Sequence, residues 1–149
     1  MNILVILIVI ILDQIGKYLA KTYLINGGKV LIENFFYLTY LENRGAAFGI
    51  LQDSRIFFII FTIIVLILLV YISRKYDKDL EKSDKIALSL IFGGAIGNFI
   101  DRLFHSYVVD FIGIIFPNGY NFPIFNIADI AITLGAFYLI IKAFISEIR

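Results

Sequence analysis

Four apolar stretches, each long enough to cross a bilayer, constrain this chain more than any other feature of its sequence. They cover about residues 3–23, 56–73, 86–103 and 125–146. A membrane-spanning helix needs about 20 mainly apolar residues. Because hydrocarbon offers no hydrogen-bond partner to the backbone, a spanning segment must satisfy its own N–H and C=O groups, as an α-helix does. The sequence therefore predicts an all-α membrane protein with four transmembrane helices, forming a single domain over residues 1–149.

Composition narrows the possible chemistry. The chain is 60% hydrophobic with a mean hydropathy of +0.92, whereas soluble domains are nearer about 45–50% apolar. It has no cysteine, which excludes disulfides, thiolate nucleophiles and cysteine-based metal centres. Its single histidine, His105, argues against a histidine-rich metal site or a Ser-His-Asp triad. The net charge of +1 gives no sign of a nucleic-acid partner.

The distribution of charge predicts the topology. Residues 74–85 carry five basic and four acidic side chains. Because orientation follows Lys and Arg rather than net charge, we expect this connector to be cytoplasmic. Both termini would then be cytoplasmic, and the loops at 24–55 and 104–124 would face outward. The first stretch lacks a basic n-region and a small-residue cleavage site, so we expect it to be retained as a helix.

The first outward loop contains a candidate β-sheet. Residues 29–41, KVLIENFFYLTYL, are rich in β-branched and aromatic side chains and follow an Asn-Gly-Gly turn at 26–28. We expect a small extracytoplasmic sheet within about residues 29–49, between the first and second helices. Its aromatic rings would rest in the headgroup layer of the membrane.

Two carboxylates are notable because they lie in or beside apolar segments. Asp110 lies in VVDF at 108–111, and Asp129 lies in FNIAD at 125–129. A charge at the middle of a membrane helix costs at least about 2.5–3.5 kcal/mol and is rare there without a function. Two acids in one low-dielectric pocket cannot both ionise cheaply, so one keeps its proton while the other stays a base. The pair indicates an aspartyl hydrolase, although the helix dipole alone would also tolerate Asp129.

The third apolar stretch ends in GGAIGNFIDR at 93–102, which combines small and polar residues. Gly93 and Gly97 are four residues apart, a spacing that favours close packing of another helix. Offsets of 0, 4, 7 and 8 share one side of a helix, and the residues at these offsets are Gly94, Asn98, Asp101 and Arg102. A polar stripe of this kind should face protein or water. Helix–helix contact would explain the glycines better than the polar residues.

Two further groups complete the candidate site. Asp13 and Lys17 are spaced i, i+4 and can form an ion pair, which we expect to pack the first helix and to support a catalytic neighbour. Asn43 opens NRGAAFG at 43–49, where glycines permit tight backbone geometry.

The residues alone leave two candidates, Asp101 and Asp110, for the acid that pairs with Asp129. Asp101 adjoins the cation Arg102, which favours an ionised, structural role. Asp110 has no adjacent cation, so its pKa is freer to rise. On the fourth helix, Asn126 and Asp129 are spaced i, i+3 and so face the same way.

Taken together, these motifs resemble those of bacterial lipoprotein signal peptidase (signal peptidase II), a family of aspartyl membrane peptidases. The matching segments are DQIGKYLA at 13–20, NRGAAFG at 43–49, GGAIGNFIDR at 93–102, VVDF at 108–111 and FNIAD at 125–129. Their order and approximate spacing also match. The resemblance implies a four-helix endopeptidase of the inner membrane that removes the signal peptide from prolipoproteins, cutting just before a diacylglyceryl-modified cysteine.

The resemblance also implies roles for individual residues. Asp110 and Asp129 match the catalytic pair. The positions that support this pair or hold substrate are matched by Asp13, Lys17, Asn43, Gly94, Asn98, Arg102 and Asn126, and we group Asp101 with them. The family further implies a monomer without metal or cofactor, whose partners are the prolipoprotein substrate and membrane lipid, and which is inhibited by the cyclic peptide globomycin.

Two other classes of function are compatible with intramembrane polar residues. A small transporter or channel subunit would spread its acids through the depth of the bilayer or use paired broken helices, whereas the polar residues here gather towards one membrane face. A non-enzymatic scaffold would explain Gly93 and Gly97 but would leave the acids without a purpose.

Overall fold

The computed structural model describes residues 1–45 and 54–147, and within them the chain forms four helices and three strands. The helices are α1 (Ile3–Tyr23), α2 (Arg55–Lys75), α3 (Lys82–His105) and α4 (Ile127–Glu147), and the strands are β1 (Lys29–Ile32), β2 (Phe36–Asn43) and β3 (Val108–Ile114). Each of these four helices is long and apolar enough to cross a membrane. The predicted spans are therefore confirmed, and the protein is a multi-pass membrane protein.

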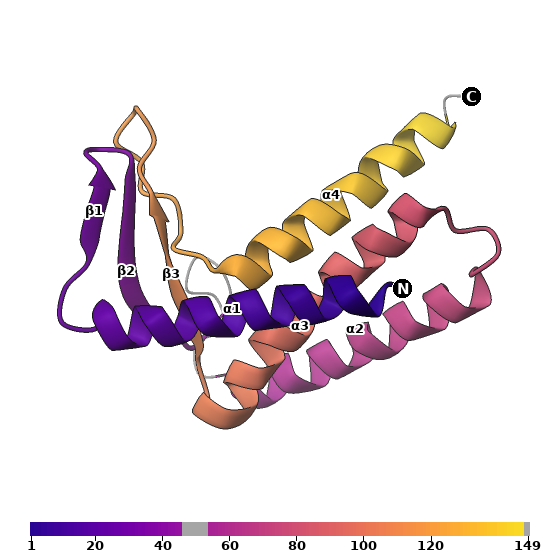
Figure 1. Cartoon of the computed structure of the whole chain (residues 1–149), viewed down its shortest axis with the longest axis horizontal. Coiled ribbons are helices and arrows are strands. Elements are labelled where there is room, and N and C mark those ends of the chain that lie inside the picture. The colour runs from indigo at the N-terminus through magenta and orange to yellow at the C-terminus, as the bar shows by residue number, and fades with distance from the viewer. Residues whose placement is uncertain (46–53, 148–149) are drawn as a thin grey trace.

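Helix α3 is the centre of the bundle. It packs against each of the other three helices, whereas α2 packs mainly against α3 (Figure 1). Small residues allow this close approach. A Cβ at Gly93 would lie 3.0 Å from the Cβ of Val9, and one at Gly97 would lie 2.6 Å from Asp13 Oδ2. The predicted packing role of these two glycines is thus confirmed, and α1 is the helix that they admit.

The connector between α2 and α3 is shorter than the charged segment at residues 74–85 suggests. Helix α2 continues to Lys75 and α3 begins at Lys82, so much of the charge block at 74–85 is helical. The early start of α3 has a local cause, because Glu81 and Asp84 form a capping box that satisfies otherwise unpaired N–H groups. Lys142 of α4 contacts both acids, with Nζ 3.0 Å from Glu81 Oε2 and 2.8 Å from Asp84 Oδ2.

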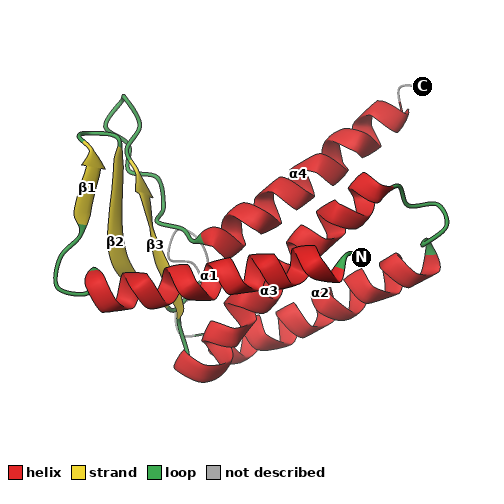
Figure 2. Ribbon diagram, in the orientation of Figure 1, coloured by secondary structure: helices red, strands yellow, loops and turns green. Residues whose placement is uncertain are grey.

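The predicted sheet is present, and it has a strand that the sequence pattern did not indicate. The strand order is β1-β2-β3, and both neighbouring pairs are antiparallel (Figure 2). The additional strand, β3, lies between α3 and α4 and carries Asp110. In the β2–β3 register, Leu41 is opposite Asp110 and Asn43 is opposite Val108. Of the segment NRGAAFG, residues 46–49 lie outside the described residues.

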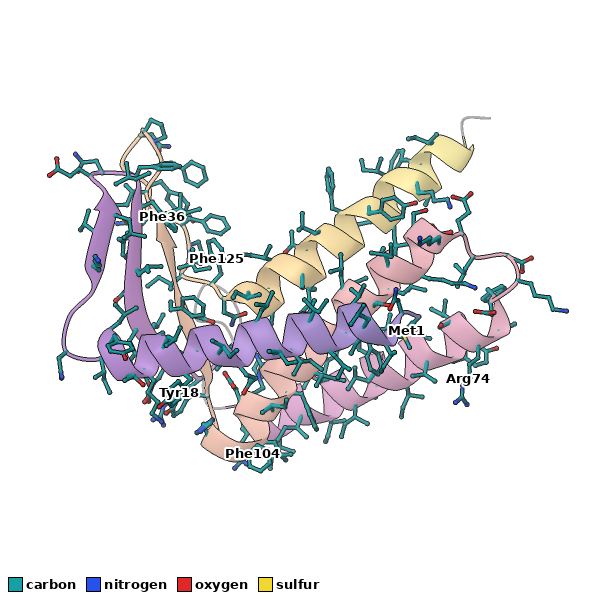
Figure 3. The ribbon with its side chains drawn as sticks, in the orientation of Figure 1. Met1, Tyr18, Phe36, Arg74, Phe104 and Phe125 are labelled. Atoms are coloured by element: carbon teal, nitrogen blue, oxygen red, sulfur yellow. The ribbon has the colours of Figure 1, made fainter. Side chains whose placement is uncertain are left out.

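The sheet is attached to the helices at one end of the bundle. Val109 and Phe111 of β3 form a buried apolar cluster with Ala20 of α1. Figure 3 shows Phe36 and Phe125 at this sheet end, and Met1 and Arg74 at the opposite end. Many large apolar side chains on the outward surfaces of the helices are exposed, for example Ile56 and Ile67 of α2. Outward apolar surfaces of this kind are expected where helices face lipid.

Candidate active site

The two candidate carboxylates are held by different kinds of backbone. Asp110 lies in β3, whose pairing with β2 fixes its position. Asp129 lies in the first turn of α4, and Asn126 caps that turn. The Asn126 N–H donates to Asp129 Oδ2 at 3.1 Å, and the Asp129 N–H donates to Asn126 Oδ1 at 2.9 Å. The sequence placed Asn126 within the fourth helix, but the helix begins at Ile127. This reciprocal capping explains the difference.

Side-chain amides connect the two carboxylates. Asn126 Nδ2 donates to Asp110 Oδ1 at 2.7 Å, and Asn98 Nδ2 donates to Asp129 Oδ1 at 2.8 Å. The two amides also meet, because Asn126 Nδ2 lies 3.1 Å from Asn98 Oδ1. On the other side, Asn43 Nδ2 donates to Asp110 Oδ2 at 2.9 Å. Both acids are therefore fixed by neutral donors contributed by three separate parts of the chain.

Both carboxylates line one cavity of about 480 Å³. Its polar side is formed by Asn43, Asn98, Arg102, Asp110 and Asp129, and its apolar side includes Phe122, Pro123, Ile124, Phe125, Ile130, Ile132 and Leu134. A pocket with convergent polar groups and apolar walls is the usual form of a site for an amphipathic ligand. The structure thus brings Asp110 and Asp129 together, as the sequence predicted.

The environment of Asp110 favours retention of a proton. Its side chain is only 2% exposed. Burial, and next the neighbouring Asp129 carboxylate, raise the pKa of the Asp110 carboxyl from 3.8 to about 7, against the lowering effect of the hydrogen bonds from Asn43 and Asn126 and of the Lys17 charge. Asp129 is only half-buried. A pair in which one acid is protonated and its partner ionised can provide both a general acid and a general base.

Arg102 supplies a cation beside this pair without forming a close ion pair to either acid among the described residues. Its charge interacts with Asp129 and Asp110, while its guanidinium lies over the Phe58 ring, 4.8 Å from the ring centroid. Arg55 of α2 donates from Nε to the Arg102 carbonyl oxygen at 2.8 Å. Neither Arg55 nor Phe58 was predicted as a site residue from the sequence, because α2 has no periodic polar pattern to mark them.

The remaining predicted residues form a layer beneath the pair. Lys17 Nζ lies 2.7 Å from Asp13 Oδ2, which confirms the expected ion pair, and also 3.1 Å from Asp101 Oδ2. The Asp101 carboxylate therefore has Lys17 of α1 as its salt-bridge partner among the described residues, while the charge of Arg102 interacts with it without a close ion pair. Gly94 allows contact with α4, since a Cβ there would lie 2.5 Å from the Ala128 carbonyl oxygen.

The described residues offer no obvious metal site. Within residues 1–45 and 54–147, no group of three or more His, Cys, Asp or Glu side chains is arranged to hold a metal ion.

Comparison with known proteins identifies the family. The sequence profile of the family described as Signal peptidase (SPase) II matches residues 5–145. The lipoprotein signal peptidase of Clostridium tetani (strain Massachusetts / E88) is 47% identical over 142 residues, covering 95% of this chain and 90% of that protein. The lipoprotein signal peptidase of Clostridium novyi (strain NT) is 44% identical over 142 residues, covering 95% of both chains. A solved bacterial membrane enzyme matches with a TM-score of 0.87 at 44% identity, covering 97% of this chain and 88% of that one. The chain therefore belongs to the signal peptidase II family, the aspartyl membrane proteases that remove signal peptides from prolipoproteins.

Proposed function

We propose that Asp110 and Asp129 are the catalytic dyad with which this peptidase hydrolyses the signal-peptide bond. One observation carries the proposal: both carboxylates line the same cavity, and Asn126 hydrogen-bonds to both of them. Two acids held this close in a largely buried site share a proton rather than both ionising. That shared proton is what an aspartyl protease requires.

The geometry supports a division of roles within the dyad. Asp110 holds the proton, because burial and the neighbouring Asp129 raise its pKa to about 7. Asp129 is the base that removes a proton from a water molecule as the water oxygen attacks the scissile carbonyl carbon. Asp110 donates its proton to the carbonyl oxygen. When the C–N bond breaks, Asp129 returns its proton to the leaving amine and Asp110 regains one from the diol. Both acids end the cycle as they began.

The lining of the cavity supports an amphipathic substrate. Its polar end, where Asn98 and Arg102 lie beside the dyad, would orient the peptide carbonyls through hydrogen bonds. Its apolar side, including Ile130 and Leu134 of α4, would contact acyl chains and signal-peptide side chains. We propose that the bond cleaved is the one just before the diacylglyceryl-modified cysteine of a prolipoprotein. The lipid chains of that cysteine would keep the scissile bond at the membrane boundary.

We also propose how the enzyme is oriented in the membrane. The connector between α2 and α3 is rich in Lys and Arg, which supports a cytoplasmic position in the inner membrane. The start of α1 and the end of α4 lie at this same end of the bundle (Figure 1), so both termini would be cytoplasmic. The site and the sheet would then face outward. We further propose that the enzyme acts as a monomer and binds globomycin in the same cavity.

Replacement of either acid tests the dyad. Purified Asp110→Asn and Asp129→Asn proteins in detergent would be given a diacylated lipobox peptide, with the cleavage position read by mass spectrometry. We expect each variant to lose about 10³-fold or more in turnover, because a general acid–base contribution is about 10²–10⁴-fold. Asp79→Asn, an exposed acid in the α2–α3 connector, serves as the matched control. Near-normal turnover in either dyad variant would remove that residue from the mechanism.

A further inference from the structure

Beneath the proposed dyad lies a second pair of carboxylates, Asp13 and Asp101. Both are buried, with 0% and 2% of their surfaces exposed. The Lys17 ammonium joins them, and it also donates to Asn98 Oδ1 at 2.9 Å. A lysine ammonium has three donors, so these three acceptors use all of them. A single positive charge therefore serves two buried negative charges.

Each carboxylate of this lower pair also holds the backbone next to one dyad residue. Asp13 Oδ1 accepts a hydrogen bond of 2.9 Å from the N–H of Ala128, the residue before one dyad aspartate. Asp101 Oδ2 accepts one of 3.0 Å from the N–H of Val109, the residue before the other. Both bonds are buried. The separation of the lower pair therefore sets the separation of the two backbone segments that carry the dyad.

Gln14 completes the connection between the two lower carboxylates. Its side-chain Nε2 lies 3.4 Å from Asp13 Oδ2 and 3.1 Å from Asp101 Oδ1, and it also contacts the Gly97 carbonyl oxygen at 3.2 Å. The amide places N–H donors between two like charges that share Lys17 as their salt-bridge partner within residues 1–45 and 54–147. Without these donors, repulsion between the carboxylates would favour a wider separation.

We infer that Gln14 is a positioning residue whose amide fixes the distance between Asp13 and Asp101 and, through their backbone bonds, the distance between the dyad carboxylates. This inference rests on the proposed function of Asp110 and Asp129. Gln14 does not line the cavity in the described part of the chain. Its loss should therefore affect the chemical step and leave substrate binding nearly unchanged.

The pKa of Asp110 depends on the spacing of the two carboxylates in the proposed dyad. The charged groups that face Asp110 are Asp129 of α4, Arg102 of α3 and Lys17 of α1, and β2 contributes the neutral Asn43. Burial and the proximity of Asp129 raise the pKa of Asp110. If the dyad widens, both effects weaken and this pKa falls. The active form, with one proton on the pair, is then lost at lower pH.

The test is a pH profile of Gln14→Met, which keeps the side-chain length but removes the amide. We expect kcat to fall about tenfold with KM within about twofold, as for loss of an interaction that serves only the transition state. We also expect the alkaline limb of the profile to move down by about half a pH unit or more. Gln14→Asn, whose amide is one methylene too short to bridge, should behave in the same way. Thr22→Val is the control, because the Thr22 hydroxyl bonds only its own helix, at Tyr18 O.

The outcomes separate positioning from folding. Unchanged kcat in Gln14→Met would overturn the inference, as would a lower kcat with an unmoved pH profile and a lower melting temperature. Failure of both Gln14 variants to give folded protein would assign the residue to folding and overturn it as well. The Asp110→Asn protein, measured in parallel, distinguishes the two proposals. If that protein is active the proposed dyad is wrong, whereas if it is inactive and Gln14→Met is normal, only this inference fails.

Discussion

Asp84 lies at one end of the helix bundle and Asp110 and Asp129 lie at the other, and different side chains hold the acids at the two ends. At the end that carries the α2–α3 connector, Asp84 is held by Lys142, whose Nζ lies 2.9 and 2.8 Å from its two oxygens. At the sheet end, Asp110 and Asp129 are held by the amides of asparagines. An acid beside an ammonium stays ionised, while an acid held by neutral donors near a second acid can keep a proton. Under the proposed function, this difference separates a structural acid, Asp84, from the two acids of the dyad.

The first prediction concerns a variant in which the sheet end, like the opposite end, has an ammonium beside an acid. Asn43→Lys would place an ammonium where an amide now donates to Asp110 at 2.9 Å. The pKa of Asp110 should then fall, leaving no protonated acid at neutral pH. We expect turnover at pH 7 to drop about 10²-fold and to recover partly as the pH is lowered.

Asn43→Ala provides the comparison, since it removes the same hydrogen bond without adding charge. Its loss of turnover should be much smaller, and its pH profile should not move to lower pH. If the lysine and alanine variants have equal activities and equal profiles, the neutral environment of Asp110 is not what makes the site work.

The second prediction concerns the unmodified enzyme. The active dyad has one proton, and the raised pKa of Asp110, about 7, means that this proton is present below that pH and lost above it. Cleavage should therefore fall as the pH rises through this value, approaching about tenfold per pH unit beyond it. The measurement is kcat against pH between about 5 and 9 with a diacylated peptide in detergent. A rate that stays level to the alkaline end would contradict the assignment of the acid.

The third prediction compares two equivalent steric changes. A Cβ at Gly94 would lie 2.5 Å from Ala128 O, and one at Gly135 would lie 2.5 Å from Ala87 O. Both alanine variants overpack the α3–α4 contact and should lose about 1–3 kcal/mol of stability. Gly94→Ala also displaces the turn that carries Asp129, so we expect it alone to lose about tenfold in kcat.

Melting temperature and kcat, measured together, separate the two glycine variants. Equal losses of kcat would mean that the whole contact, rather than its sheet end, controls the dyad.

Local sequence patterns accounted for most of the fold. The four helices follow from apolar length alone, which is a property of consecutive residues. Strand β3 was missed because its partner lies far away along the chain: Asn43 and Asp110 are 67 positions apart. The capping role of Asn126 was missed for another reason, because apolar hydropathy continues across Phe125 and hides the start of α4.

The site was less predictable than the fold. Asp110 and Asp129 came from motif order, and Asp13 with Lys17 came from helical spacing. Gln14 lies in the matching segment DQIGKYLA but was not predicted as a site residue, and Phe58 lies in a stretch without charged residues; each contacts a residue of α3. Helical offset also put Asp101 beside Arg102, whereas its carboxylate contacts Lys17 and Gln14 of α1 and the Val109 N–H of β3. The spacing of residues along one helix gives only an approximate direction for each side chain. The packing of the neighbouring helices determines which residue that side chain contacts.

The last prediction tests how the cation at the sheet end is held. Lys142 is held by carboxylates, whereas Arg102 lies over the Phe58 ring at 4.8 Å; under the proposed function its guanidinium donors would bind substrate. Phe58→Leu should raise KM about two- to fivefold, the equivalent of the roughly 0.5–1 kcal/mol of a partly exposed cation–π contact. The same change at Phe61, an exposed ring on the same helix, controls for loss of aromatic area in the membrane. If both variants raise KM equally, α2 contributes only lipid contact. If only Phe58→Leu does, α2 is part of the site through the orientation of Arg102.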